Sequence, residues 1–185
     1  MKKRLALLLL AVCLLGAAAC SGGERELTEA ALLALNEEET YEEDRLFCYA
    51  DIFASVSELY DASELIVECS VDTAETLTLE GHPEKYSTVT VNTVLRGEAE
   101  EGGALVVLEG PSPVPKLEEG QHLILFLNEC DSAWYDELYC ISGGQGKFIE
   151  REGYYFQQAH HTVKLPLEEY YPQTLSGFTG LLDQI

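Results

Sequence analysis

Basic residues are scarce in this chain, in which 11 lysines and arginines stand against 33 aspartates and glutamates and give a formal net charge of −22 at pH 7. Cationic side chains supply much of the affinity for nucleic acids, because they neutralise phosphates, so this balance argues against a nucleic-acid partner. It also argues against adsorption of the protein surface to an anionic membrane. The composition favours solubility and cationic partners.

Recognised catalytic and metal-binding motifs are also absent. The sequence contains no Gly-x-Ser-x-Gly, His-Glu-x-x-His, Cys-x-x-Cys or Asp-x-Asp-x-Asp-Gly pattern. The glycine-rich segment 143–147 is not a Walker A loop, because Ile141 occupies the position of its first glycine and Phe148 that of its Ser or Thr. We therefore interpret this segment as a tight corner of a β-barrel, and we predict no catalytic residues, no metal and no cofactor.

The longest apolar run, Leu5–Leu15, lies close to the N-terminus. It follows the basic residues at positions 2–4 and precedes the small residues Gly16–Ala19, which is the order found in a secretory signal peptide. The run is too short for a bilayer-spanning helix, which needs roughly 20 residues. The sequence therefore predicts an exported protein.

The segment Ala17–Cys20, followed by Ser21, resembles the lipobox of bacterial lipoproteins. The resemblance implies cleavage before Cys20 and transfer of a diacylglyceryl group to its thiol, and two acyl chains hold a protein stably on a bilayer. We therefore expect a signal peptide over residues 1–19 and a lipid on Cys20 that anchors the protein to a bacterial cell membrane, facing outside the cytoplasm. An ordinary secretory signal cut near Ala19 and an uncleaved anchor stay open as alternatives.

Removal of residues 1–19 would leave eight lysines and arginines against 33 acidic residues, a net charge of −25. Part of this excess lies in the segment 24–44, which carries nine acidic residues and only Arg25 as a basic one. Because like charges extend a chain, we expect residues 20–47 to form an acidic tether, within which Leu27–Leu35 has a short helical pattern. A metal-collecting acidic patch is the alternative, although no oxygen-ligand spacing supports it.

Four cysteines remain once Cys13 leaves with the signal and Cys20 is lipidated. An even number of cysteines in an exported domain allows two disulfides with three connectivities. Two of the four flank a polar, turn-like insert, so we predict one disulfide between Cys130 and Cys140, which leaves Cys48 to pair with Cys69. Four reduced, mostly buried thiols stay open as the alternative.

The remaining chain is dominated by short strand patterns between Gly, Pro and Asp residues. A helix is predicted over Asp51–Asp61, where apolar residues recur at three- and four-residue spacing, and a second over Thr174–Ile185. Strands are predicted over Leu65–Leu79 with a bend near Asp72, Thr88–Leu95, Ala104–Leu108, Gln121–Asn128, Leu138–Ser142, Lys147–Glu150 and Tyr154–Gln158. The pattern indicates a mainly β (α+β) fold over residues 48–185, a small closed OB-like β-barrel with a preceding helix and a C-terminal helix.

The order of these features resembles small exported bacterial proteins with an OB-fold of the netrin-module or tissue-inhibitor-of-metalloproteinase type. The resemblance is carried by Ala62–Val71, Thr88–Gly97, Lys116–Leu127 and Gly143–Phe148. It implies the fold. The eukaryotic inhibitors of this type chelate a protease zinc through a free N-terminal cysteine, and a lipidated Cys20 on a tether lacks that chemistry.

OB-folds commonly bind ligands across the second and third strands and the adjacent loops. By this fold analogy alone, the expected binding face contains Thr88, Thr90, Asn92, Ser112 and Lys116. We expect a binding or interaction module for an unknown peptide, glycan or protein ligand. An inhibitor or accessory subunit of an extracytoplasmic enzyme is the alternative, and a hydrolase with an unrecognised site is a third.

Two further groups of residues are expected to be structural. His160 and His161 are adjacent and would point to opposite faces of a strand, so we place them in a solvated loop and not in a metal site. A group of aromatic residues is expected to pack the C-terminal helix and hairpin against the barrel, with an exposed stacking platform as the alternative. These residues are Tyr154, Tyr155, Phe156, Tyr170 and Tyr171.

Overall fold

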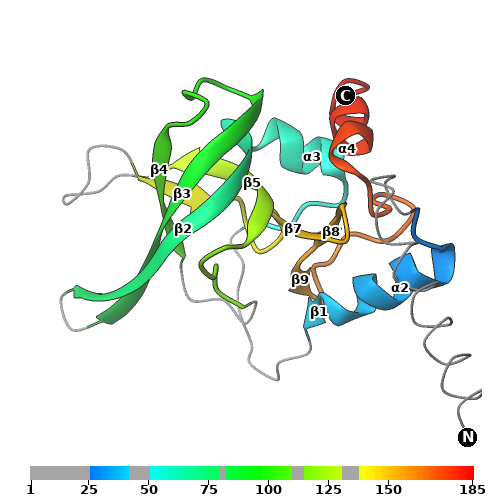
Figure 1. The fold of residues 1–185 in the computed structure, drawn as a ribbon, viewed down its shortest axis with the longest axis horizontal. Helices are drawn as coiled ribbons and strands as arrows, with labels where there is room; N and C mark the ends of the chain where they lie inside the picture. The colour runs from blue at the N-terminus through cyan, green and yellow to red at the C-terminus, as the bar shows by residue number, and fades with distance from the viewer. Residues whose placement is uncertain (1–25, 42–50, 80–81, 110–114, 131–137) are drawn as a thin grey trace, which may run out of the picture.

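The computed structural model describes residues 26–41, 51–79, 82–109, 115–130 and 138–185 (Figure 1). The predicted signal peptide, Cys20, Cys48 and Ser112 lie outside these ranges. Within them, no helix combines the length and the apolar character needed to cross a membrane.

Five strands form a closed barrel, as the sequence predicts. They are β2 (Leu65–Leu79), β3 (His82–Arg96), β4 (Ala104–Glu109), β5 (His122–Glu129) and β6 (Tyr139–Ile141). β2, β3 and β4 follow one another as antiparallel neighbours. The barrel closes because β4 pairs in parallel with β6, β6 pairs with β5, and β5 returns to β2. The Val- and Thr-rich sequences of β2 and β3 suit such pleated, half-buried surfaces.

The hairpin of β2 and β3 is the longest pair of strands in the sheet (Figure 1). Its register shifts between Val71 and Thr73, which leaves Asp72 as a bulge and confirms the predicted bend. β3 begins at His82, whereas the sequence pattern predicted a strand only from Thr88. Pairing with β2 over residues 73–79 explains this extension, because the partner strand supplies the hydrogen bonds that a weak local pattern does not signal.

β5 is buried on both of its faces. Leu123, Leu125 and Leu127 point into the barrel core, while Ile124 and Phe126 point outward into a second apolar cluster. None of these five side chains is exposed. This confirms the prediction of a central strand covered on both sides.

The second cluster fills the space between the barrel and the C-terminal half of the chain. Its outer wall is the hairpin of β7 (Lys147–Arg151) and β8 (Tyr154–Gln157), together with α3 (Val56–Asp61) and α4 (Leu175–Leu182). Phe178 of α4 lies at its centre, with ring centroids 5.1 Å from Phe148 and 5.6 Å from Tyr170. In Figure 1, α3 and α4 stand beside each other on this side of the barrel.

α3 begins at Val56 and not at Asp51, which corrects the predicted start of this helix. Ser55 is its N-cap: the Glu58 N–H donates to Ser55 Oγ at 3.1 Å, and Glu58 Oε2 accepts from the Ala54 N–H at 2.7 Å. These two bonds satisfy the amide N–H groups of Ala54 and Glu58, which have no carbonyl partner in a preceding helical turn, and so favour a helix that starts at Val56. Residues 51–54 therefore run as an irregular segment into the helix.

The acidic N-terminal segment is not a free tether over residues 27–41, and this corrects the sequence-based expectation. α2 (Glu29–Glu38) packs Leu32 against the barrel core, and β1 (Thr40–Tyr41) pairs in parallel with β9 (Ala159–His160). A salt bridge of 3.1 Å joins Glu39 to Arg151. Apolar burial and a cationic partner thus overcome the repulsion that the charge pattern alone suggests.

One of the two predicted disulfides is present. Cys130 and Cys140 are bonded, with their Cα atoms 6.0 Å apart, and they tie the end of β5 to the short strand β6. The predicted bridge between Cys48 and Cys69 is wrong at its described end, because Cys69 is a free thiol. Its side chain is fully buried and points into the barrel core. A second cysteine could reach it only if it were also inside the core.

Loss of the disulfide should destabilise the protein without changing its fold. The crosslink spans a sequence separation of 10 residues, and closing a loop of that size is worth about 2.5 kcal/mol in the chain-entropy model. We expect the Cys130→Ser/Cys140→Ser double variant to lower the free energy of urea unfolding by this amount. Wild-type protein in reducing agent should unfold at the same urea concentration as the variant, and unchanged stability in both would contradict the assignment.

Candidate functional site

Three of the predicted binding residues lie on the outer face of β3. Thr88, Thr90 and Asn92 alternate with Val89 and Val91, which are fully buried in the barrel core. Side chains on a strand point alternately to its two faces, so the three polar residues project outward. Asn92 is exposed, and both threonines are half-buried.

Thr90 and Asn92 form hydrogen bonds with polar residues on the neighbouring strand. Thr90 Oγ1 donates to Asp72 Oδ2 at 2.6 Å, and Asn92 Nδ2 donates to Ser70 Oγ at 2.9 Å. Ser70 Oγ in turn lies 3.2 Å from His122 Nδ1 on β5. These polar residues of β2, β3 and β5 are called the outer polar face below, and they are Glu68, Ser70, Asp72, Thr90, Asn92 and His122.

Glu68 connects the outer polar face to the second apolar cluster. Its carboxylate is largely buried and accepts from Asn92 Nδ2 at 3.2 Å and from the Tyr155 hydroxyl at 3.3 Å. Burial and the neighbouring Glu68 carboxylate raise the pKa of Tyr155 well above its usual value, so the phenol keeps the proton that it donates. Sequence reasoning missed Glu68, although its position in the apolar run Leu65–Cys69 was the available signal.

Lys116 is not part of this face. It lies near Glu109 and Lys85, and its Nζ donates to the Glu109 carbonyl at 3.3 Å. Lys85 and Asn92 are seven positions apart along β3, a length of about 23 Å in a strand. The structure therefore divides the predicted binding residues between the outer polar face and one end of the barrel.

A buried carboxylate closes that end of the barrel. Glu109 is 7% exposed; its Oε1 accepts from Ser87 Oγ at 3.1 Å and its Oε2 from the Leu117 N–H at 2.8 Å. Leu117 itself is fully buried in the barrel core. The carboxylate thus holds the chain that follows β4 across the barrel end.

Three lysines surround this carboxylate and bind the same stretch of chain. Lys85 Nζ donates to the Leu117 carbonyl at 2.6 Å, and Lys147 Nζ donates to the Pro115 carbonyl. Lys147 is only 5% exposed, and burial lowers its pKa to about 8. The three residues, Lys85, Lys116 and Lys147, are called the lysine end of the barrel below.

The glycine-rich corner after β6 is structural, as the sequence predicts. A Cβ on Gly146 would lie 2.9 Å from the Phe126 and Ser142 carbonyl oxygens, so only glycine fits there. The Gln145 side chain between the glycines accepts from the Phe53 N–H at 2.6 Å and donates to the Phe53 carbonyl at 2.7 Å. The corner thereby fixes the segment that leads into α3.

The histidine pair and the aromatic residues differ in outcome. His160 is buried in β9, with its Nδ1 2.8 Å from Thr162 Oγ1, which corrects the expected solvated loop at this residue, whereas His161 is exposed in the turn that follows. The aromatic packing prediction is confirmed for Tyr155, Phe156 and Tyr170, all of which are buried. The Tyr170 hydroxyl donates to the Tyr155 carbonyl at 2.7 Å and so holds the chain before α4 against the hairpin.

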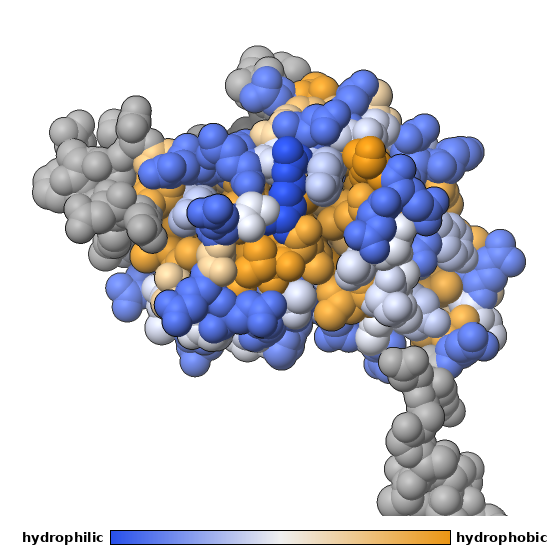
Figure 2. Space-filling model, turned by 90° about the horizontal axis from the view of Figure 1, so that it is seen from above, coloured by the Kyte–Doolittle hydropathy of each residue, from blue (hydrophilic) through white to orange (hydrophobic). Residues whose placement is uncertain are grey.

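A pocket opens at the end of the barrel opposite the lysine end. It has a volume of about 540 Å³ and is bounded by the turn between β3 and β4, the start of β4, and β6. The turn lies at the top of Figure 1, and Figure 2 views the molecule from that side, where apolar surface in the middle is bordered by hydrophilic residues. The residues that line the pocket are Glu98, Ala99, Glu100, Gly103, Ala104, Leu105 and Tyr139.

Neither site has the donor set of a metal centre, since the described residues contain no cluster of three or more His, Cys, Asp or Glu side chains arranged to hold an ion. Comparisons of the chain with protein-family models, with curated proteins and with solved structures find no match.

The buried Lys147 predicts a pH dependence of stability. Its pKa is about 8 in the folded state and near 10.5 when the chain unfolds. Between these values the unfolded chain binds more protons, so the penalty for burying Lys147 is present at pH 8 and is lost as the pH rises to 10.5. We expect the Lys147→Met variant to lose this dependence, which amounts to about 2 kcal/mol between pH 8 and pH 10.

Urea unfolding at several pH values measures this effect. Lys164→Met is the matched comparison, because burial also lowers the pKa of Lys164 to about 8 but its side chain is less deeply buried. It should remove a smaller part of the dependence. Parallel stability curves for the wild type and Lys147→Met would show that Lys147 does not cause it.

Proposed function

We propose that this protein is a lipid-anchored, extracytoplasmic binding module of a bacterial cell, which contacts its ligand through the outer polar face. The observation that carries the proposal is the network of Asn92, Ser70 and His122 across β3, β2 and β5. Side chains on three adjacent strands hold one another in place, so the face is organised before a ligand arrives. Preorganisation of this kind lowers the entropy cost of binding.

The chemistry of the face suits a polar ligand. It offers hydroxyl, amide and imidazole groups, which both donate and accept hydrogen bonds, together with the Asp72 carboxylate. Such groups match the hydroxyls of a glycan or the main chain of a peptide or a protein surface. An inhibitor or accessory subunit of an extracytoplasmic enzyme would use the same face, with the enzyme as its ligand.

The proposed anchor would hold the module close to the membrane. α2 is docked on the barrel from Glu29, and the eight residue-to-residue steps from Cys20 to Thr28 span at most about 29 Å when fully extended. Two acyl chains supply stable anchoring even though a protein with this negative charge is repelled by anionic lipid. The docked helix therefore makes the tether shorter than the sequence pattern suggested.

The anchor is tested by the Cys20→Ala variant expressed in a bacterium. Wild-type protein should incorporate radiolabelled palmitate and fractionate with membranes, whereas the variant should incorporate none and appear in the soluble extracytoplasmic fraction. Cys69→Ala, which removes a thiol from the barrel core, is the control and should stay lipidated. Full membrane retention of the Cys20→Ala variant would refute the anchor.

The outer polar face is tested by crosslinking and affinity capture from the producing bacterium's envelope, with glycan and peptide arrays alongside. The Asn92→Ala/His122→Ala variant should bind the captured ligand about tenfold more weakly, because two hydrogen bonds are lost. The matched control is Gln184→Ala/His161→Ala, which removes the same chemical groups from exposed positions elsewhere. Equal binding by both variants and the wild type would reject the face, and capture of a hydrolase would favour the inhibitor or accessory role.

A further inference from the structure

We infer that the pocket at the barrel end binds a basic peptide segment, with a lysine or arginine next to an apolar residue. This would be a second ligand site, separate from the outer polar face. The inference comes from three properties of the pocket: an apolar wall, an acidic rim and its place in the charge distribution of the barrel.

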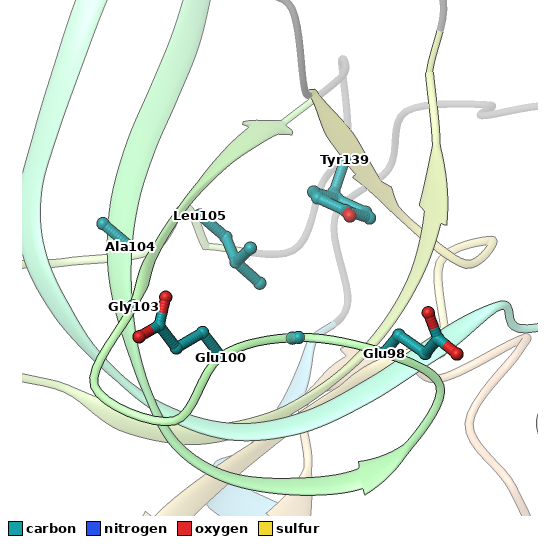
Figure 3. A pocket seen from close by; sticks show the side chains of 7 residues that line it. Glu98, Glu100, Gly103, Ala104, Leu105 and Tyr139 are labelled. Atoms are coloured by element: carbon teal, nitrogen blue, oxygen red, sulfur yellow. The ribbon is translucent and has the colours of Figure 1, made fainter.

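The wall of the pocket is apolar. Leu105 is 8% exposed and belongs to the barrel core, and Ala99 and Tyr139 pack against that core while lining the pocket. Figure 3 shows the side chains of Leu105 and Tyr139 on the same side of the space, one from β4 and the other from β6. A methyl-rich surface of this kind binds aliphatic groups through the water that it releases.

The rim of the pocket is acidic. Glu98 and Glu100 are exposed on the turn between β3 and β4, and they are the only ionised side chains among the lining residues. Glu101 lies on the same turn. Glu64 and Glu129 lie at this end of the barrel as well, since the Glu129 N–H donates to Glu64 Oε2 at 2.8 Å beside the start of β2.

Most cations near the barrel lie elsewhere. Arg96, at the end of β3, is close to the turn, but its guanidinium lies over the Tyr60 ring at 4.2 Å and donates to the Tyr60 carbonyl. Lys85, Lys116 and Lys147 form the lysine end, on the far side of the core from Glu98 and Glu100. No lysine or arginine lines the pocket to offset its carboxylates. The charge separation directs the negative potential of the domain toward the pocket and disfavours an anionic ligand there.

The shape and chemistry together identify the occupant. A volume of about 540 Å³ is in the range of clefts that bind small ligands or side chains. Lysine and arginine have aliphatic stems that lie along apolar surface while the charged head stays in water. A stem against Leu105 and Tyr139, with its head near Glu98 and Glu100, uses both features of the pocket.

The pocket lies on the side of the molecule where a ligand from outside the cell would meet it. In Figure 1 the turn that forms the rim lies at the upper left of the molecule, and α2 lies at the lower right. The chain reaches the domain through α2, so the pocket lies on the side remote from the proposed anchor.

Fluorescence anisotropy on the full-length mature protein tests the inference. The probe is a labelled heptapeptide with a Lys-Leu-Lys core between glycines, and the comparison peptides have Glu-Leu-Glu and Lys-Ser-Lys cores. We expect the first comparison peptide to bind at least tenfold more weakly than the probe and the second about fivefold more weakly. Spermidine, a cation without an apolar side chain, should compete poorly.

Variants identify the site. Glu98→Gln/Glu100→Gln should weaken binding of the probe about fivefold at 50 mM salt, and the difference should disappear at 500 mM salt, where exposed charges are screened. Glu118→Gln/Glu119→Gln is the matched control, because it makes the same change at exposed positions near the lysine end. The control should bind as the wild type does.

Equal binding by Glu98→Gln/Glu100→Gln and the wild type at 50 mM salt would overturn the inference, as would equal binding of the Lys-Leu-Lys and Glu-Leu-Glu peptides. The Asn92→Ala/His122→Ala variant separates the two sites. It should bind the probe with unchanged affinity. Loss of probe binding in the pocket variants would therefore count only for or against the pocket, and the array and capture experiments would decide on the outer polar face separately.

Discussion

The structure depends on a single strand that is buried on both sides. β5 pairs with β2, β6 and β7, and so it is the strand through which the barrel closes and the C-terminal hairpin attaches. Its leucines complete the barrel core, while Ile124 and Phe126 begin the second cluster. A shift of one residue along β5 would exchange these two sets, so each core fixes the register of the other. Helices α3 and α4 then find a surface whose shape is already set by the strand.

The charges of the domain follow from the same architecture. A closed barrel has two ends that water can reach, and the chain closes them by different means. Lysines and the buried Glu109 carboxylate hold residues 115–117 over one end. The charged groups there are hydrogen-bonded to backbone carbonyls and amides. The other end is spanned by a short turn whose exposed Glu98 and Glu100 line the pocket. The free negative charge is therefore concentrated at the end that stays hollow.

The strands were predictable because each is a local pattern bounded by turn residues, and the bulge at Asp72 could be placed because a polar residue interrupts the alternation. Longer-range features were less accessible. The docking of α2 depends on Leu32 meeting the barrel core and on Glu39 meeting Arg151, more than 100 residues away in the chain. Lys116 was assigned to the binding face by fold analogy. Such an analogy predicts which strands and loops are near a ligand, but it does not predict at which end of the barrel a given side chain lies. Cys69 keeps a free thiol because its side chain points into the barrel core, and the number of cysteines in a sequence does not reveal that direction.

Buried residues beneath the outer polar face hold part of that face in place. Glu68 is largely buried yet accepts from Asn92, so one residue of the exposed face is fixed by a carboxylate that also receives the Tyr155 hydroxyl. Tyr155 packs in the second cluster beneath α4. A side chain that is held from below loses little conformational freedom when a ligand arrives, whereas an isolated surface asparagine would lose it all at that moment. The second cluster therefore does more than stabilise the fold, because it also orders the face that we propose to bind the ligand.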